Sequence, residues 1–193
     1  MANGSHITRS LEPVLKRAAA EFPAVVLTGP RQSGKTTLLK RLFGKRFRYV
    51  SLEPPDVRAA AVGDPRGFLE MHPAPVIFDE AQHAPELLPY VKERIDADRS
   101  RAGQYLLSGS QNMLLMEKVG ESLAGRAAVL RLLPLSCREI AGRPRAPLPW
   151  EPGRHARPDP ALAGAGLWEQ FLRGGYPELA ANPRRDAALW HAS

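Results

Sequence analysis

This chain contains a complete phosphate-loop motif, G-x-x-x-x-G-K-[ST], at residues Gly29 to Thr36. The apolar run from Ala24 to Leu27 precedes the motif and predicts a buried strand, and residues 37–42 have the composition and spacing of a helix. A strand, the loop and a helix in this order form the structural context that the motif requires. The sequence therefore predicts an α/β fold with a nucleoside triphosphate as its first ligand. The alternative is a Gly-Pro turn that matches the motif by chance.

The residue types in this loop have separate tasks. Gly29 and Gly34 let backbone N–H groups turn inward around phosphate oxygens at a helix N-terminus, whose partial positive charge favours an anion. Lys35 adds a full charge that can bridge the β- and γ-phosphates, and the Thr36 hydroxyl can bind Mg²⁺. We therefore expect ATP or ADP to be held by Gly29, Pro30, Arg31, Gln32, Ser33, Gly34, Lys35, Thr36 and Thr37.

A second apolar run, Pro75 to Phe78, ends in the acid pair Asp79 and Glu80, as expected of a Walker B strand. Ligands of open α/β sheets bind at the carboxyl ends of the strands, where these acids would lie. Asp79 would hold Mg²⁺ together with Thr36, directly or through a water, and Glu80 would accept a proton from the water that attacks the γ-phosphate. The alternative is an acid pair that opens a helix, where carboxylates suit the helix dipole.

A third strand is predicted at Gln104 to Leu107, and polar residues 108–111 follow it. A polar side chain at the tip of the strand beside the phosphate loop can sense the γ-phosphate or orient the attacking water. Gln111, or Ser108, is the predicted contact. The alternative is an ordinary polar turn in which Ser110 caps the next helix.

Arg126 lies between Gly125, which can end a helix, and the apolar run from Ala127 to Leu133. An arginine at this point could stabilise charge that develops on the γ-phosphate, either in its own chain or in a neighbouring one. The alternative is a surface arginine or a structural ion pair, the commoner role of a single arginine.

Together these elements resemble a group of bacterial and archaeal AAA-type ATPases, AAA domain family 14, whose members usually continue into a C-terminal domain of unknown function. The resemblance covers His6 to about Ile140. It rests on matching stretches at residues 27–38, 49–53, 64–69, 79–82, 107–111, 122–126 and 132–136. It implies a three-layer P-loop NTPase with a five-stranded parallel sheet in the order 5-1-4-3-2, flanked by helices, and a catalytic glutamate.

The expected organisation has three parts. Residues 1–141 form the AAA-type P-loop ATPase core, residues 142–160 a Pro/Gly-rich linker or arm, and residues 161–193 a helical segment. The resemblance implies that this helical segment opens a C-terminal domain that is largely absent from a chain ending at Ser193. In the core we expect helices at residues 7–21, 56–62, 65–71 and 85–98, the last with Leu87, Leu88, Val91 and Ile95 facing inward.

Composition limits the setting of the protein. The 193 residues suffice for one α/β domain with a modest appendage, but not for the paired cores of a processive helicase. There is no long apolar stretch or signal-peptide region, so a cytoplasmic protein without a membrane partner is expected. The single Cys137 is read as a structural thiol. A net charge of +7 favours RNA or DNA as a partner, although an even spread of arginine through the chain explains the same charge.

Three functions agree with these features. The first is Mg²⁺-dependent ATP hydrolysis that drives a conformational change, possibly on nucleic acid. The second is a slow nucleotide-gated switch for a protein partner, which would bind through the missing C-terminal domain. The third is a P-loop small-molecule kinase, which the Asp79-Glu80 pair disfavours because a second carboxylate suits water activation better than group transfer. We expect this chain to be mainly monomeric.

Overall fold

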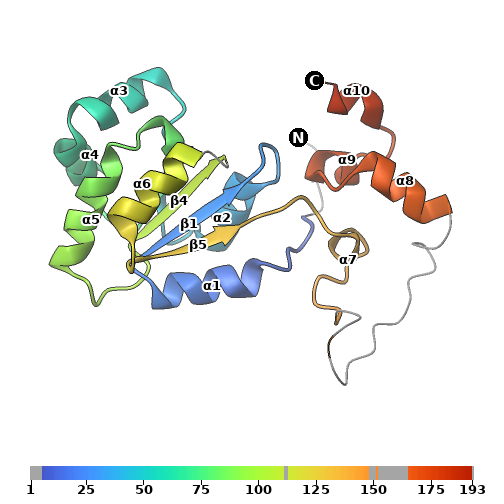
Figure 1. Cartoon of the computed structure of the whole chain (residues 1–193), viewed down its shortest axis with the longest axis horizontal. Coiled ribbons are helices and arrows are strands. Elements are labelled where there is room, and N and C mark those ends of the chain that lie inside the picture. The colour runs from blue at the N-terminus through green and yellow to red at the C-terminus, as the bar shows by residue number, and fades with distance from the viewer. Residues whose placement is uncertain (1–5, 111–112, 148–150, 152–164, 193) are drawn as a thin grey trace. The chain divides into compact units, whose positions relative to one another are not determined.

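The computed structural model describes residues 6–110, 113–147, 151 and 165–192. The chain divides into two compact units (Figure 1), one of residues Leu11–Leu132 and one that combines Met1–Ser10 with Leu133–Ser193. The first unit therefore ends before residue 141, the core boundary expected from the sequence. The expected linker at 142–160 lies largely outside the described residues.

The first unit is built on a sheet of five parallel strands. The sheet order β2-β3-β4-β1-β5 confirms the predicted order, read from the opposite edge. The strands are β1 (Ala24–Gly29), β2 (Arg48–Ser51), β3 (Val76–Asp79), β4 (Tyr105–Ser110) and β5 (Ala127–Arg131).

Alternate residues of the strands enter two separate apolar cores, because successive side chains of a strand point to opposite faces. In β1, Ala24 and Val26 belong to one core, and Val25 and Leu27 belong to the other. All six residues of β1 are buried, as expected for a central strand of a parallel sheet.

Helices cover both faces of the sheet and give the unit three layers (Figure 1). Residues of α1 and α2 fill one core with the sheet, and residues of α3 to α6 fill the other. The bounds are α1 (Glu12–Glu21), α2 (Lys35–Phe43), α3 (Pro55–Gly63), α4 (Pro65–Met71), α5 (Leu87–Ala97) and α6 (Met113–Leu123), with the short 3₁₀ helix η1 (Ala81–His83) after β3. The four residues predicted to face inward from α5 are all buried.

Helix α1 begins at Glu12 and not at Ile7 as expected. Pro13 lies in its first turn, where a missing backbone N–H costs nothing. The residues before it make other contacts: Arg9 forms a buried ion pair with Glu139 at 3.2 Å, and the Ser10 N–H donates to the same carboxylate at 2.6 Å. Residues 6–10 therefore belong to the second unit.

The second unit contains the short helix α7 (Cys137–Ile140), then α8 (Ala165–Arg173), α9 (Pro177–Ala181) and α10 (Ala187–His191). Ser136 and Glu139 form a reciprocal capping box at the start of α7. Burial would raise the pKa of Glu139, but hydrogen bonds from the Ser136 and Ser10 N–H groups and the charge of Arg9 lower it below its ordinary value. Glu139 therefore stays ionised as the anchor of the N-terminal segment.

The helical segment expected at residues 161–193 is described from Ala165 onward, and residues 161–164 lie outside the described residues. Three large apolar residues of α8, Trp168, Phe171 and Leu172, are exposed, whereas Leu167 is partly buried. In the part of the chain that the structure describes, we find no helix with the length and apolar character needed to cross a membrane.

Candidate nucleotide-binding site

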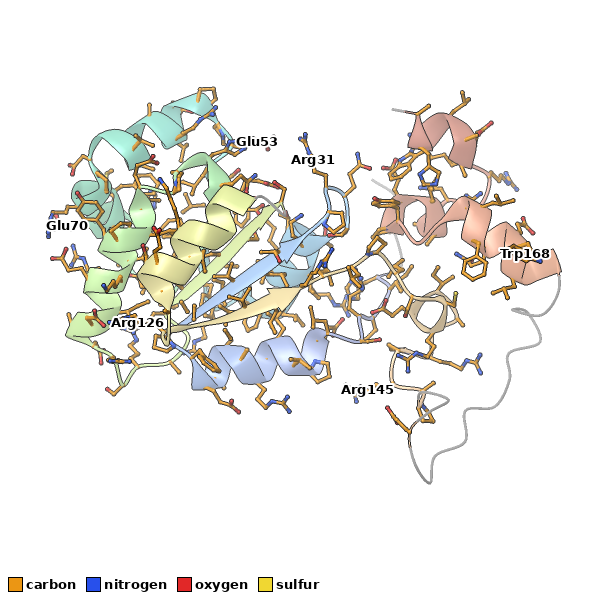
Figure 2. The ribbon with its side chains drawn as sticks, in the orientation of Figure 1. Arg31, Glu53, Glu70, Arg126, Arg145 and Trp168 are labelled. Carbon is orange, nitrogen blue, oxygen red and sulfur yellow. The ribbon has the colours of Figure 1, made fainter. Side chains whose placement is uncertain are left out.

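The phosphate loop follows β1 directly and leads into α2, as the motif requires. Gly34, the residue before α2, has a φ of 93°, a conformation that glycine adopts without strain. Gly29 has a φ of 155°, and a Cβ placed on it would lie 2.2 Å from the Leu132 carbonyl oxygen. Any other residue at position 29 would therefore displace backbone. Arg31 lies exposed on the loop (Figure 2).

Lys35 is 5% exposed and folds back onto the loop. Its Nζ donates to the Gly29 carbonyl at 3.1 Å and to the Pro30 carbonyl at 2.9 Å. Burial lowers the pKa of Lys35 below its ordinary value, although the carboxylates of Glu80 and Asp79 oppose this shift. The ammonium group is thus held by neutral carbonyl oxygens in a partly desolvated place, where phosphate oxygens would be stronger acceptors.

Asp79 is the last residue of β3 and is 3% exposed. Its carboxylate accepts hydrogen bonds from three hydroxyl groups. Thr36 donates to Oδ2 at 2.7 Å, Tyr49 donates to Oδ2 at 2.7 Å, and Ser108 donates to Oδ1. Because β3 and β4 are adjacent and β4 pairs with β1, the carboxyl ends of these strands bring the acid, the serine and the phosphate loop together. Thr36 and Asp79, which were predicted to share a Mg²⁺, are joined here by a direct hydrogen bond, and the shared ion stays a prediction.

Glu80 lies directly after β3, with φ 57° and ψ 45°. This left-handed conformation is uncommon for a residue other than glycine, and such strained positions cluster at functional sites. The Glu80 carboxylate accepts a hydrogen bond from Gln82 Nε2. The acid pair therefore does not open a regular α-helix: η1 follows, and α5 begins only at Leu87.

Of the two predicted γ-phosphate sensors, the structure describes only Ser108. Ser108 is fully buried and touches Asp79, so it lies at the site. Gln111 lies outside the described residues, and its sensor role stays a prediction.

Arg126 does not lie at the site, which corrects the expectation that it acts there in its own chain. It immediately precedes β5, whereas the phosphate loop follows β1, and β1 and β5 are parallel. Arg126 and Arg31 therefore lie at opposite ends of the sheet (Figure 2). Arg126 donates to both carboxylate oxygens of Asp96, at 2.7 and 2.9 Å, and this contact lowers the pKa of Asp96. The structural ion pair is thus present, and a role in a neighbouring chain stays a prediction.

The oxygen atoms of this site suit Mg²⁺. A hydroxyl that donates its proton to Asp79 leaves the lone pairs of Thr36 Oγ1 available to a hard cation, and Asp79 would then orient this ligand or a coordinated water. Among the described residues no group of three or more His, Cys, Asp or Glu could hold a metal. An ion at Thr36 and Asp79 would complete its coordination with water and phosphate oxygens, as is usual for Mg²⁺ with nucleotides.

Two contacts of this site were not predicted from the sequence, those of Tyr49 and Gln82. Tyr49 lies on β2 and reaches Asp79 on β3, and Lys40 Nζ lies 3.5 Å from the centre of its ring. Burial and the hydrogen bond to Asp79 raise the pKa of Tyr49. Tyr49 therefore keeps its proton and remains a donor to Asp79. The sequence signal was weak: Tyr49 is one residue of the stretch 49–53 that carries the family resemblance.

We expect the substitution Tyr49→Phe to lower the melting temperature by about 2–4 °C, because a hydrogen bond worth about 1 kcal/mol is lost while the ring is kept. Tyr90→Phe is the matched control, because Tyr90 lies on α5 and its ring interaction with Arg66 does not need the hydroxyl. Thermal unfolding followed by circular dichroism measures both. Equal melting temperatures for Tyr49→Phe and the parent would show that the Tyr49 hydroxyl does not stabilise Asp79.

The parallel sheet, the phosphate loop and the acid pair at the end of the neighbouring strand define a P-loop NTPase. The chain belongs to the AAA domain family AAA_14, whose model matches residues 21–141. This confirms the resemblance seen in the sequence. Membership of this family together with the intact loop supports nucleotide binding of the ATPase type.

Two mycobacterial relatives are similar over most of the chain. They are the uncharacterized proteins Rv2008c of Mycobacterium tuberculosis and Mb2031c of Mycobacterium bovis, each 33% identical over 178 residues and 91% of this chain. The aligned part is 35% of each relative, so the chain spans about a third of their length.

A solved structure has a similar fold. The Walker-type ATPase PABY2304 of Pyrococcus abyssi matches with a TM-score of 0.56 and 17% identity, over 93% of this chain and 67% of that one. At this identity the match supports the fold alone.

Proposed function

We propose that this chain binds Mg²⁺-ATP at the phosphate loop and hydrolyses it, and that hydrolysis drives a conformational change. The observation that carries the proposal is the arrangement around Asp79: a carboxylate that is 3% exposed accepts the hydroxyl of Thr36, the last residue of the phosphate-loop motif. Glu80 follows it at the carboxyl end of the sheet. A metal-orienting acid beside a possible proton acceptor suits hydrolysis.

The residues would then act as follows. Lys35 would exchange the carbonyls of Gly29 and Pro30 for β- and γ-phosphate oxygens. Glu80 would accept a proton from water while the water oxygen bonds to the γ-phosphorus and the bond from that phosphorus to the leaving oxygen of ADP breaks. Thr36 would hold Mg²⁺, and Asp79 would orient the Thr36 hydroxyl or a water bound to the ion. The ion would neutralise charge on the phosphates.

A slow nucleotide-gated switch is the second candidate. Gln82 Nε2 donates to Glu80 Oε2, and this hydrogen bond restricts rotation of the carboxylate that would face the attacking water. Slow turnover would follow if this contact persisted with nucleotide bound. A kinase reaction would need an acceptor group beside the γ-phosphate, and the second carboxylate of the Asp79-Glu80 pair suits water activation better than group transfer.

Partners are part of the proposal and not of the structure. The net charge of +7 would attract RNA or DNA. A protein partner would bind a region that corresponds to the part of the longer relatives not matched by this chain.

Phosphate release from ATP separates these functions. With excess Mg²⁺ we expect many turnovers per chain, and with EDTA in place of Mg²⁺ we expect turnover to fall to background. A switch would release about one phosphate per bound nucleotide and then stall, and a kinase would release none without an acceptor. Adding RNA or DNA in parallel reactions tests stimulation. A protein that binds no ATP in equilibrium dialysis would contradict every form of the proposal.

A further inference from the structure

Charge is divided unevenly within the first unit. Residues 22–52, which include β1, the phosphate loop, α2 and β2, carry seven cations and no acid. Residues 53–98, which include α3 to α5, carry four cations and ten acids. The even spread of arginine along the whole chain therefore hides a separation of charge between two segments of the core.

Five of the seven cations are exposed where α2 ends and β2 begins. We call them the basic surface: Lys40, Arg41, Lys45, Arg46 and Arg48. No ion pair among the described residues includes any of the five. Between α4 and α5, in contrast, Arg66 pairs with Glu93 at 2.8 Å and Arg94 pairs with Glu70 at 3.2 Å. The charge of the basic surface is thus left for a ligand outside the chain.

The neighbours of the basic surface attract its cations without neutralising them. Lys40 Nζ lies over the ring of Tyr49, and the Arg46 guanidinium lies 5.6 Å from the centre of the Phe47 ring. Arg48 donates to the Met71 carbonyl at 2.7 Å. Aromatic rings and a backbone carbonyl carry no net charge, so each of these side chains keeps its full positive charge at the surface.

The backbone holds the cations close together. The Phe47 N–H donates to the Phe43 carbonyl at 2.8 Å, so helical bonding continues just beyond the end of α2. Phe47 is 4% exposed and anchors this turn in the core. Arg41 and Lys45 are four residues apart here, and like charges at this spacing destabilise a helix. An anionic ligand would relieve this repulsion.

The helix dipole accounts for only part of the cluster. Lys40 and Arg41 lie in the last turn of α2, where cations suit the dipole, but this effect is confined to that turn. The other three cations lie beyond it. Helix α1, which fills the same core as α2, carries two cations and two acids and therefore does not cancel the charge.

We propose that the basic surface binds the phosphate backbone of double-stranded nucleic acid without reading its sequence. The inference rests on the nucleic-acid partner in the proposed function, for which it names the surface and the form of the ligand. Three of the five cations are arginines, whose planar donors match phosphate oxygens in pairs. A duplex presents phosphates at high, regular density, which favours binding by charge alone.

The apolar residues of this segment disfavour other anionic ligands. None of the large apolar residues that are exposed among the described residues lies within residues 40–48. Unpaired bases would need an exposed aromatic ring on which to stack, and a membrane surface is usually held by exposed apolar side chains as well as by charge. A polar, arginine-rich surface without either feature suits a duplex backbone.

Fluorescence anisotropy of short labelled duplexes, measured without nucleotide, tests this binding. We expect duplex DNA and duplex RNA to bind, with duplexes of unrelated sequence agreeing within about twofold. With about four phosphate contacts, the affinity should fall by about 10²-fold between about 50 and 200 mM salt. A single strand of the same length should bind more weakly, because its charge density is lower.

The test variant is Arg41→Gln combined with Arg46→Gln. Loss of two phosphate contacts should weaken duplex binding by about 10- to 100-fold at about 50 mM salt and make the salt dependence shallower. Arg41→Lys combined with Arg46→Lys keeps the charge and should keep most of the affinity. The matched control is Arg58→Gln combined with Lys118→Gln, on α3 and α6 at the opposite face of the sheet, and it should bind within about twofold of the parent. All three variants should melt within about 3 °C of the parent, as is usual for surface substitutions.

Several results would overturn the inference. Absence of duplex binding at about 50 mM salt would do so, as would an equal loss in the glutamine variant and its control. Tighter binding of the single strand would exclude recognition of a duplex. A lysine variant as weak as the glutamine variant would mean that packing, and not charge, was lost. If vesicles containing phosphatidylserine, or polyglutamate, bound to the basic surface and duplexes did not, the partner would be a membrane or an acidic protein.

These outcomes are separate from those of the proposed hydrolysis, because duplex binding is measured without ATP. A parent that bound duplexes but did not hydrolyse ATP would remove the proposed hydrolysis and leave the basic surface as a nucleic-acid site. A parent that hydrolysed ATP but bound no duplex would remove this inference alone.

Discussion

Replacing Lys35 with alanine is expected to weaken the binding of Mg²⁺-ATP by about 10²–10³-fold, because charge-assisted hydrogen bonds are worth about 1.5–3 kcal/mol each and two or more reach the phosphates. The change also removes the two hydrogen bonds from Nζ to the Gly29 and Pro30 carbonyls, so part of the loss reflects a looser loop. Isothermal titration calorimetry with Mg²⁺-ATP measures the affinity.

The control for this variant is Lys45→Ala. Lys45 is exposed just beyond the end of α2, so its removal changes the net charge equally without touching the loop. We expect its affinity for Mg²⁺-ATP to stay within about twofold of the parent, because a distant surface charge is largely screened at physiological salt. If Lys35→Ala bound Mg²⁺-ATP as tightly as the parent, residues 29–36 would not be the nucleotide site.

Replacing Glu80 with glutamine should lower turnover by about 10²–10⁴-fold while nucleotide affinity persists, which is the range for loss of a general base. The amide keeps the size of the carboxylate, and its oxygen can still accept the hydrogen bond from Gln82. The variant therefore tests the chemistry of the group more than the shape of the turn. Phosphate release in the steady state and ATP binding in the same buffer separate the two effects.

Glu53→Gln is the matched control for Glu80→Gln. Glu53 is an exposed glutamate just beyond the end of β2 (Figure 2). Because β2 and β3 are parallel, its substitution makes the same change of charge at the same carboxyl edge of the sheet. Its turnover should equal that of the parent. An undiminished turnover number for Glu80→Gln would remove Glu80 from the mechanism.

The sequence predicted the parts of the site that depend on local pattern. The phosphate loop predicted β1 before it and α2 after it, and the apolar run before Asp79 predicted β3. Each motif occurs next to a strand or helix of known type, so no contact distant in sequence is needed. The order of the strands came from the family resemblance and agrees with the structure.

Contacts between strands could not be predicted in this way. Tyr49 is far from Asp79 in sequence, and it reaches that carboxylate only through the pairing of β2 with β3, in which Ser51 lies opposite Asp79. The contact of Gln82 with Glu80 occurs where Glu80 has a left-handed backbone conformation. Glutamate rarely adopts this conformation, so the residue type did not predict it.

The place of Arg126 could have been deduced from topology. A residue that precedes a strand lies at the amino edge of a parallel sheet, and the phosphate loop lies at the carboxyl edge. Sequence position beside Gly125 carries no information about the edge. Once β5 is placed parallel to β1, the apolar run at residues 127–133 already puts Arg126 at the end of the sheet opposite the phosphate loop.

The packing of Gly29 changes how substitutions in the phosphate loop should be interpreted. The Leu132 N–H donates to the Thr28 carbonyl at 2.8 Å, and this bond holds the Leu132 carbonyl against the α-carbon of Gly29. A mutational scan would find position 29 intolerant even in a protein that never meets a nucleotide, since a methyl group there collides with backbone of a neighbouring segment. A loss of function on substitution of Gly29 therefore tests the assembly of the sheet. Substitution of Lys35, whose side chain carries the charge, tests binding of the ligand.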